Sequence, residues 1–168
     1  MIFVSVGTHE AQFDRLIKEI DYLVEKEIIK DKVIAQYGYG NYIPKHLAEA
    51  ERFFPYDKTQ ELAKEADILI THGGPSSFIM GLENGKIPIV VPRRKEFGEH
   101  VNDHQVVFCH EVARRQHNII VIDNVRDLSE VILNYDALVK QLSTTMVHNN
   151  AKFCEEFEKI ALNLVGGK

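Results

Sequence analysis

A glycine-rich turn at residues 72–77 contains residue types that suit a chemical task. It consists of His72, Gly73, Gly74, Pro75, Ser76 and Ser77. A turn of this kind exposes backbone N–H groups, and the helix expected after it adds partial positive charge, so it can hold a diphosphate. The turn lacks the Gly-Lys-Ser/Thr ending of a P-loop and the spacing of the dinucleotide fingerprint. A plain turn with a serine helix cap is the alternative.

A second segment, residues 99–105, is dense in hydrogen-bonding side chains. It contains Glu99, His100, Asp103, His104 and Gln105. Sugar hydroxyls need such converging groups when they leave water, so these five side chains are candidates for reading a sugar ring. A metal site on His100 and His104 would need a third ligand, and the HExxH pattern is absent, so we expect no metal. A solvated helix start capped by Asp103 is the other alternative.

Two further loops follow apolar runs. Gly7 allows a tight turn before Thr8, whose hydroxyl can contact a ligand or cap a helix. His9 can reach a reaction centre or simply face solvent. Gly38 permits close approach of the backbone to a ligand, although an ordinary turn explains it as well.

The elements that must position these loops alternate along the chain. Expected strands are 2–6, 32–36, 51–55, 67–71, 87–91 and 118–122, and expected helices are 12–26, 59–65, 77–84, 103–115 and 127–134. This order predicts an α/β fold with a Rossmann-like parallel sheet flanked by helices, in one domain over residues 1–168. Residues 138–168 form an expected helical tail. All four loops then lie at the carboxyl ends of the strands, where open α/β sheets bind ligands.

Composition and charge limit the classes of protein to which this chain can belong. The chain has 168 residues and a net charge of −5, which disfavours general nucleic-acid binding. The two cysteines form no CxxC pair, which is typical of reduced thiols. We expect no signal peptide and no membrane span, and therefore a cytoplasmic protein.

In this order the segments resemble the C-terminal domain of family-28 glycosyltransferases. The matching segments are VGTH at 6–9, QYG at 36–38, ADILITHGG at 66–74, GKIPIVVPR at 85–93 and EHVNDHQ at 99–105. They closely resemble the small subunits of bacterial capsular and exopolysaccharide transferases of the PssE/EpsF type, which are commonly β-1,4-galactosyltransferases. More distantly, they resemble the soluble catalytic subunit of the split eukaryotic enzyme that adds GlcNAc to a dolichol-linked sugar.

The resemblance implies the donor-binding half of a GT-B enzyme, with a UDP-sugar as substrate and no cofactor or metal. It implies inverting transfer of a hexose, galactose by the nearest match, to a lipid-linked saccharide. A membrane-associated second subunit would bring the acceptor, hold this chain at the inner face of the membrane, and supply the catalytic base. His9 is the in-chain candidate for that base. The implied nucleotide and diphosphate contacts are Gly7, Thr8, Gly38, His72, Gly73, Gly74, Ser76, Ser77 and Glu83.

One position departs from the pattern of the distant relatives. The acidic residue that contacts the ribose falls at Met80 here, and Glu83 is the nearest carboxylate. A non-catalytic UDP-sugar-binding module remains the alternative function. The isolated chain could also form a homodimer. The tail residues Phe153, Phe157, Ile160 and Leu164 could pack on this domain or on another subunit.

Overall fold

Six parallel strands form one open sheet in the computed structural model, which describes residues 1–142. The strands are β1 (Ile2–Ser5), β2 (Val33–Gln36), β3 (Glu49–Glu51), β4 (Ile68–His72), β5 (Ile89–Val91) and β6 (Ile120–Val121). Their order across the sheet is β3-β2-β1-β4-β5-β6, and every paired ladder is parallel. The chain therefore reverses its direction of travel across the sheet between β1 and β4, which creates a crevice at their carboxyl ends.

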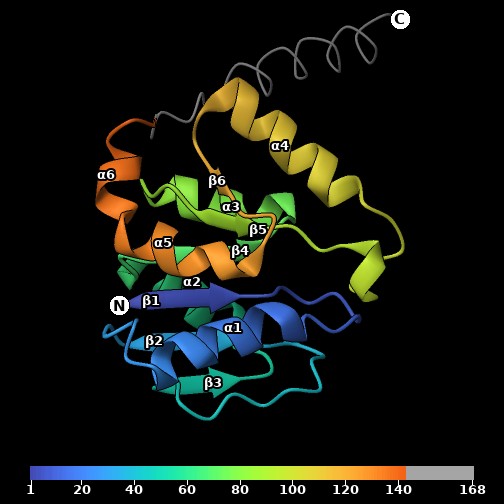
Figure 1. Ribbon diagram of the computed structural model, residues 1–168, viewed down its shortest axis with the longest axis vertical. Helices are drawn as coiled ribbons and strands as arrows, with labels where there is room; N and C mark the ends of the chain where they lie inside the picture. The colour runs from blue at the N-terminus through green and yellow to red at the C-terminus, as the bar shows by residue number, and fades with distance from the viewer. Residues whose placement is uncertain (143–168) are drawn as a thin grey trace, which may run out of the picture.

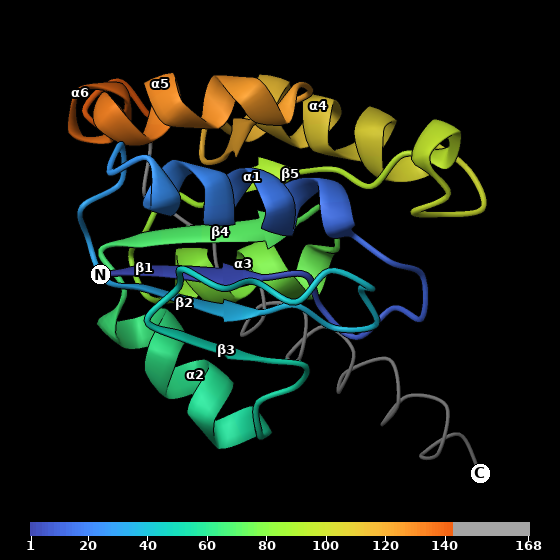
Figure 2. The same ribbon diagram turned by 60° about the horizontal axis from the view of Figure 1, so that its bottom comes forward.

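Helices cover both faces of this sheet (Figures 1 and 2). They are α1 (Asp14–Glu25), α2 (Tyr56–Glu65), α3 (Pro75–Glu83), α4 (His104–Gln116), α5 (Leu128–Leu133) and α6 (Tyr135–Val139), with short 3-10 turns η1 (Lys95–Phe97) and η2 (Val125–Asp127). Helices α1, α5 and α6 pack into one core with alternate residues of the strands. Helices α2, α3 and α4 pack against the other face through two smaller clusters. The expected sheet with flanking helices is confirmed.

The apolar strand sequences explain why both faces are covered. All four residues of β1 are buried, with Phe3 in the core beneath α2 and Val4 in the core beneath α1. A strand that is apolar on both faces is stable only between two layers of helix. Helix α1 contributes a single buried stripe that includes Leu16, Ile20 and Leu23, as its spacing of apolar residues predicts.

The structure differs from the sequence expectation around the third strand. Strand β3 ends at Glu51, whereas residues 51–55 were expected to be extended. The backbone N–H of Phe54 donates to the side-chain oxygen of Gln36 at 3.0 Å, so this residue leaves the ladder. Pro55 then occupies the N-cap position of α2, which begins at Tyr56, three residues before the expected start at residue 59.

The last described elements pack back on the sheet. Helix α5 corresponds to the helix expected over 127–134, and α6 is a second, short helix that follows it. The Tyr135 hydroxyl donates to the Ile87 carbonyl at 2.6 Å. The tail expected over 138–168, with its apolar residues, lies mostly outside the described residues. Within residues 1–142, none of the helices combines the length and apolar character that a membrane crossing requires.

Candidate functional site

A cavity of about 500 Å³ opens at the crevice where the strand order reverses. It is lined by Ser5, Gly7, Thr8, Gln36, Phe54, Tyr56, Thr59, Gln60, His72, Ser76, Ser77, Ile79, Met80 and Glu83. The lining comes from the ends of β1, β2 and β4, from the loops that follow β1 and precede α2, from the first half of α2 and from α3 along its length. Its size falls in the range of small-molecule sites. The structure thus brings the loop after β1 and the glycine turn together around one space.

His72 shapes the glycine turn from within. Its Nδ1 accepts the backbone N–H of Gly74 at 2.9 Å, and its side chain is buried. A Cβ atom on Gly7 would lie 2.1 Å from the His72 ring, and one on Gly74 would lie 2.2 Å from it. Burial, followed by the positive charge of Arg93, lowers the pKa of His72 to about 3, so the ring is neutral. His72 therefore holds the conformation of the turn, and its side chain borders the cavity.

The side chains of α3 face the cavity along one side. Ser76 is exposed at the start of the helix, and the Ser77 hydroxyl lies 3.5 Å from His72 Nε2. Met80 is buried in the core yet borders the cavity, and exposed Glu83 stands one helical turn further on. Glu83 is thus the residue of α3 whose carboxylate lines this cavity.

Several lining residues were not predicted from the sequence. Tyr56, Thr59 and Gln60 line the cavity from the first half of α2, and Phe54 lines it from the segment just before this helix. Gln36 is held at both ends of its amide, donating to Gly7 O at 3.2 Å and accepting from Phe54 N.

Gly38 supports this wall without being part of it. It is buried, and its φ is +59°. A Cβ there would meet Val6 at 2.9 Å. The residue is absent from the cavity lining of the described chain, and it lets the loops after β1 and β2 approach each other.

A second cavity, of about 380 Å³, lies on the other side of the glycine turn. It is lined by Gly73, Gly74, Pro75, His104, Gln105 and Phe108. The side-chain oxygen of Gln105 accepts the backbone N–H of Arg93 at 3.1 Å, which leaves the amide nitrogen as the donor of this side chain. Two expected sugar-reading residues, His104 and Gln105, therefore meet the expected diphosphate turn here.

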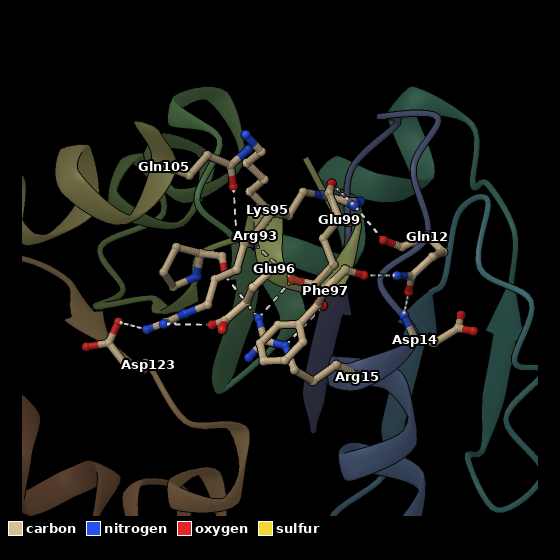
Figure 3. Close-up of polar contacts among 12 residues, drawn as sticks. Gln12, Asp14, Arg15, Arg93, Lys95, Glu96, Phe97, Glu99, Gln105 and Asp123 are labelled. Carbon is tan, nitrogen blue, oxygen red and sulfur yellow. Dashed lines mark hydrogen bonds and ion pairs between the residues drawn. The ribbon is translucent and has the colours of Figure 1, made fainter. Parts of the chain in front are cut away.

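Arg93 joins the loops that carry these residues (Figure 3). Its guanidinium is fully buried and donates to the carbonyls of Val6 at 2.9 Å, of Ala11 and Gln12 at 3.0 Å, and of Glu99 at 3.2 Å. Burial lowers its pKa to about 10, so it remains charged near neutral pH. The loop after β1 is thereby tied to the segment after β5. A charged residue just after a buried strand was the available sequence signal.

Glu99 and Asp103 are placed differently from the expected sugar readers. The Glu99 carboxylate is completely buried, accepts two hydrogen bonds of 3.0 Å from Arg15, and accepts the Arg94 backbone N–H at 3.0 Å. Asp103 Oδ1 accepts the Lys95 backbone N–H at 2.8 Å. Neither side chain lines the two cavities, and a sugar contact by Glu99 or Asp103 stays a prediction.

Three imidazoles gather where these loops meet. The His9 and His100 ring centres are 4.7 Å apart, and those of His100 and His104 are 4.5 Å apart. Burial, and then the neighbouring His104 and His9, lower the pKa of His100. No group of three or more His, Cys, Asp or Glu side chains within residues 1–142 is placed to ligate one metal ion.

Comparison with known proteins identifies the fold and the family. Residues 1–162 match the glycosyltransferase family 28 C-terminal domain. The chain is 31% identical over 125 residues to the human UDP-N-acetylglucosamine transferase subunit ALG13, an alignment that covers 69% of this chain and 10% of that protein. The chain thus spans only a tenth of the length of this curated relative.

One solved structure supports the fold. The calicheamicin glycosyltransferase CalG4 superposes with a TM-score of 0.56 at 12% identity, covering 98% of this chain and 43% of that one. SnogD from Streptomyces nogalater matches with a TM-score of 0.48 at 16% identity, covering 84% and 39%. The open six-stranded parallel sheet is that of a GT-B glycosyltransferase half, and the chain belongs to the glycosyltransferase family 28 C-terminal domain family.

Proposed function

We propose that this chain is the donor-binding subunit of a two-component inverting glycosyltransferase that moves a hexose from a UDP-sugar to a lipid-linked saccharide. The cavity at the strand crossover carries the proposal. There the N-terminus of α3, the glycine turn and two serine hydroxyls face one space suited to a nucleoside diphosphate. The uracil then lies toward Phe54 and Tyr56, and the ribose toward Glu83.

The sugar is proposed to occupy the second cavity. Gln105 offers an amide donor there and His104 an imidazole, on the side of the turn away from the nucleotide. We propose galactose on the resemblance of the matching segments to galactosyltransferase subunits of capsule and exopolysaccharide synthesis. The name of the human relative favours N-acetylglucosamine instead, so both donors belong in the test.

A partner subunit is the second part of the proposal. The human relative is named as a subunit of a transferase, and its similarity to this chain supports a divided enzyme. The partner would carry the acceptor and the catalytic base and keep this cytoplasmic chain at the membrane. His9, beside His100 in the described structure, is the in-chain residue to test for the base.

Calorimetric titration tests donor binding. The chain is titrated with UDP, UDP-galactose, UDP-N-acetylglucosamine and UDP-glucuronic acid, first without metal and then with Mg²⁺. We expect metal-independent binding that one sugar strengthens. A chain that binds none of these donors, alone or with its co-expressed partner, contradicts the proposal.

A transfer assay on the co-expressed pair separates an enzyme subunit from a non-catalytic module. Gln105→Ala is expected to abolish transfer while partner binding is retained. Unchanged transfer in this variant would favour the non-catalytic module.

A further inference from the structure

The walls of the second cavity carry no lysine, arginine, aspartate or glutamate among the described residues 1–142. Gly73, Gly74 and Pro75 of the glycine turn line it on one side of the sequence, and three residues of α4 complete the lining. A charged group placed in this space would therefore leave water without a fixed counter-charge in the lining, which is unfavourable. The second cavity is suited to a neutral group.

Phe108 gives this cavity a flat apolar surface. It follows His104 by four positions on α4, so both residues lie on the same side of the helix, and both line the cavity. Phe108 is 40% exposed, whereas Phe78 is buried in the core, and the centres of the two rings are 6.1 Å apart. Phe78 therefore supports Phe108 from the core, and part of the Phe108 side chain stays accessible to a ligand.

Hydrogen-bonding groups accompany this aromatic surface. The Gln105 side-chain oxygen accepts the Arg93 backbone N–H at 3.1 Å, so its NH₂ group remains available as a donor, and His104 adds an imidazole. An apolar surface with a few polar groups is the usual composition of a small-molecule site. A sugar ring matches it, because the ring carries hydroxyls around its edge and C–H groups on its faces.

Hexoses differ in how much apolar surface one face of the ring offers to an aromatic side chain. The axial 4-hydroxyl of galactose lies on one face, so the C–H groups of C3, C4 and C5 form a continuous apolar patch on the other face. In glucose, the epimer at C4, the hydroxyl is equatorial and the C4–H group points to the opposite face. Stacking against a flat ring therefore buries more apolar surface with galactose than with glucose.

We propose that the second cavity takes a neutral hexose, and that Phe108 selects galactose by stacking against the C–H face of its ring. This inference rests on the proposed function, in which the nucleoside diphosphate occupies the first cavity and the sugar occupies the second. The aromatic side chain discriminates between the epimers at C4, and the uncharged lining discriminates against uronic acids. Phe108 is thus a specificity-determining residue for the donor sugar.

Calorimetric titration of the full chain with UDP, UDP-galactose, UDP-glucose and UDP-galacturonic acid tests both parts. The titrations are made near pH 8, above the range in which imidazoles ordinarily gain charge. UDP-galactose is expected to bind about three- to tenfold more tightly than UDP-glucose, the effect of burying one or two more C–H groups. UDP-galacturonic acid, which differs from UDP-galactose at C6, is expected to bind about tenfold more weakly than UDP-galactose or worse, because its carboxylate meets no fixed counter-charge.

Substitutions at Phe108 assign the preference to this side chain. Phe108→Leu keeps an apolar contact with Phe78 but removes the flat ring, and it is expected to bring the affinity ratio of UDP-galactose to UDP-glucose close to one. Phe108→Tyr keeps the ring and should keep the ratio. Val107→Ala is the matched control, because Val107 is 70% exposed on the same helix and is absent from the cavity lining. Unchanged affinity for UDP shows that each variant is folded.

The outcomes separate the inference from the proposed function. A ratio close to one in the wild type, a ratio retained in Phe108→Leu, or tighter binding of UDP-N-acetylglucosamine than of UDP-galactose overturns the selection of galactose by Phe108. Binding of UDP-galacturonic acid as tight as that of UDP-galactose overturns the neutral-sugar assignment. In each of these cases UDP still binds and the donor site stands. Failure of UDP and of all these UDP-sugars to bind overturns the proposed function and the inference together.

Discussion

Arg15 and Glu99 lie 84 residues apart in the sequence, and their side chains form two parallel hydrogen bonds of 3.0 Å (Figure 3). The carboxylate is completely buried and the guanidinium side chain is 15% exposed. The pair fixes the start of α1 to the segment after β5, where Arg93 makes a second connection. The loop that carries His9 and the segment between β5 and α4 are therefore positioned by buried charge.

Replacing Glu99 by Gln should destabilise the fold substantially. The amide leaves the Arg15 guanidinium mostly buried without its counter-charge, and breaking such a pair costs about 3 kcal/mol. Urea denaturation measures the loss in the free energy of unfolding. Glu61→Gln is the matched control, because its partner Lys58 and Glu61 itself are 40% and 53% exposed and such pairs contribute less than about 1 kcal/mol. Equal losses in the two variants would contradict the structural role of Glu99.

The buried imidazole of His72 should make stability fall in mild acid. Its folded-state pKa is lowered to about 3, so below the ordinary value of 6.5 the unfolded chain binds a proton that the folded chain does not. The contribution is complete above 6.5 and is lost as the pH falls toward 3, with a slope of up to about 1.4 kcal/mol per pH unit.

Urea denaturation between about pH 6.5 and pH 5 measures this slope. His72→Asn should reduce it, because the Asn side-chain oxygen can still accept the Gly74 N–H without titrating. His117→Asn, at the surface, serves as the control with an unchanged slope. A wild-type slope retained in His72→Asn would assign the acid sensitivity to other groups.

The parts of the fold set by local pattern were predictable, and the parts set by long-range contacts were not. Continuous apolar runs predicted β1 and β4, and spacing of three and four predicted α1. The third strand was misplaced because Phe54 looks extended in sequence, whereas its N–H is taken by Gln36, 18 residues away. The ion pair of Glu99 with Arg15 was not predicted for the same reason, since the two residues are 84 positions apart in the sequence.

Within the site, the glycine turn was predicted from its type of residues. Its neighbours Phe54 and Tyr56 carry no motif, because only the packing of α2 brings them to the cavity.

Glu83 is predicted to hold the ribose, because it is the carboxylate of α3 that lines the first cavity. Glu83→Ala should weaken UDP binding about tenfold, since a hydrogen bond to a charged group contributes about 1.5–3 kcal/mol. The same substitution should weaken the binding of 2′-deoxy-UDP less than that of UDP, because 2′-deoxy-UDP lacks one of the ribose hydroxyls. Calorimetric titration of both ligands measures the difference. Equal weakening of the two would show that Glu83 acts on another part of the nucleotide.

Gln105→Glu is predicted to remove sugar recognition while the fold is kept. The new carboxylate can still accept the Arg93 backbone N–H, so the connection to the segment after β5 survives, but the NH₂ group that faces the second cavity is gone. UDP-galactose should then bind no more tightly than UDP in calorimetric titration, a loss of whatever preference the wild type shows for the sugar nucleotide. Gln116→Glu, at the end of α4, controls for the added negative charge. If Gln105→Glu weakens UDP and UDP-galactose by the same factor, the side chain acts on the diphosphate through its charge, and the sugar is read elsewhere.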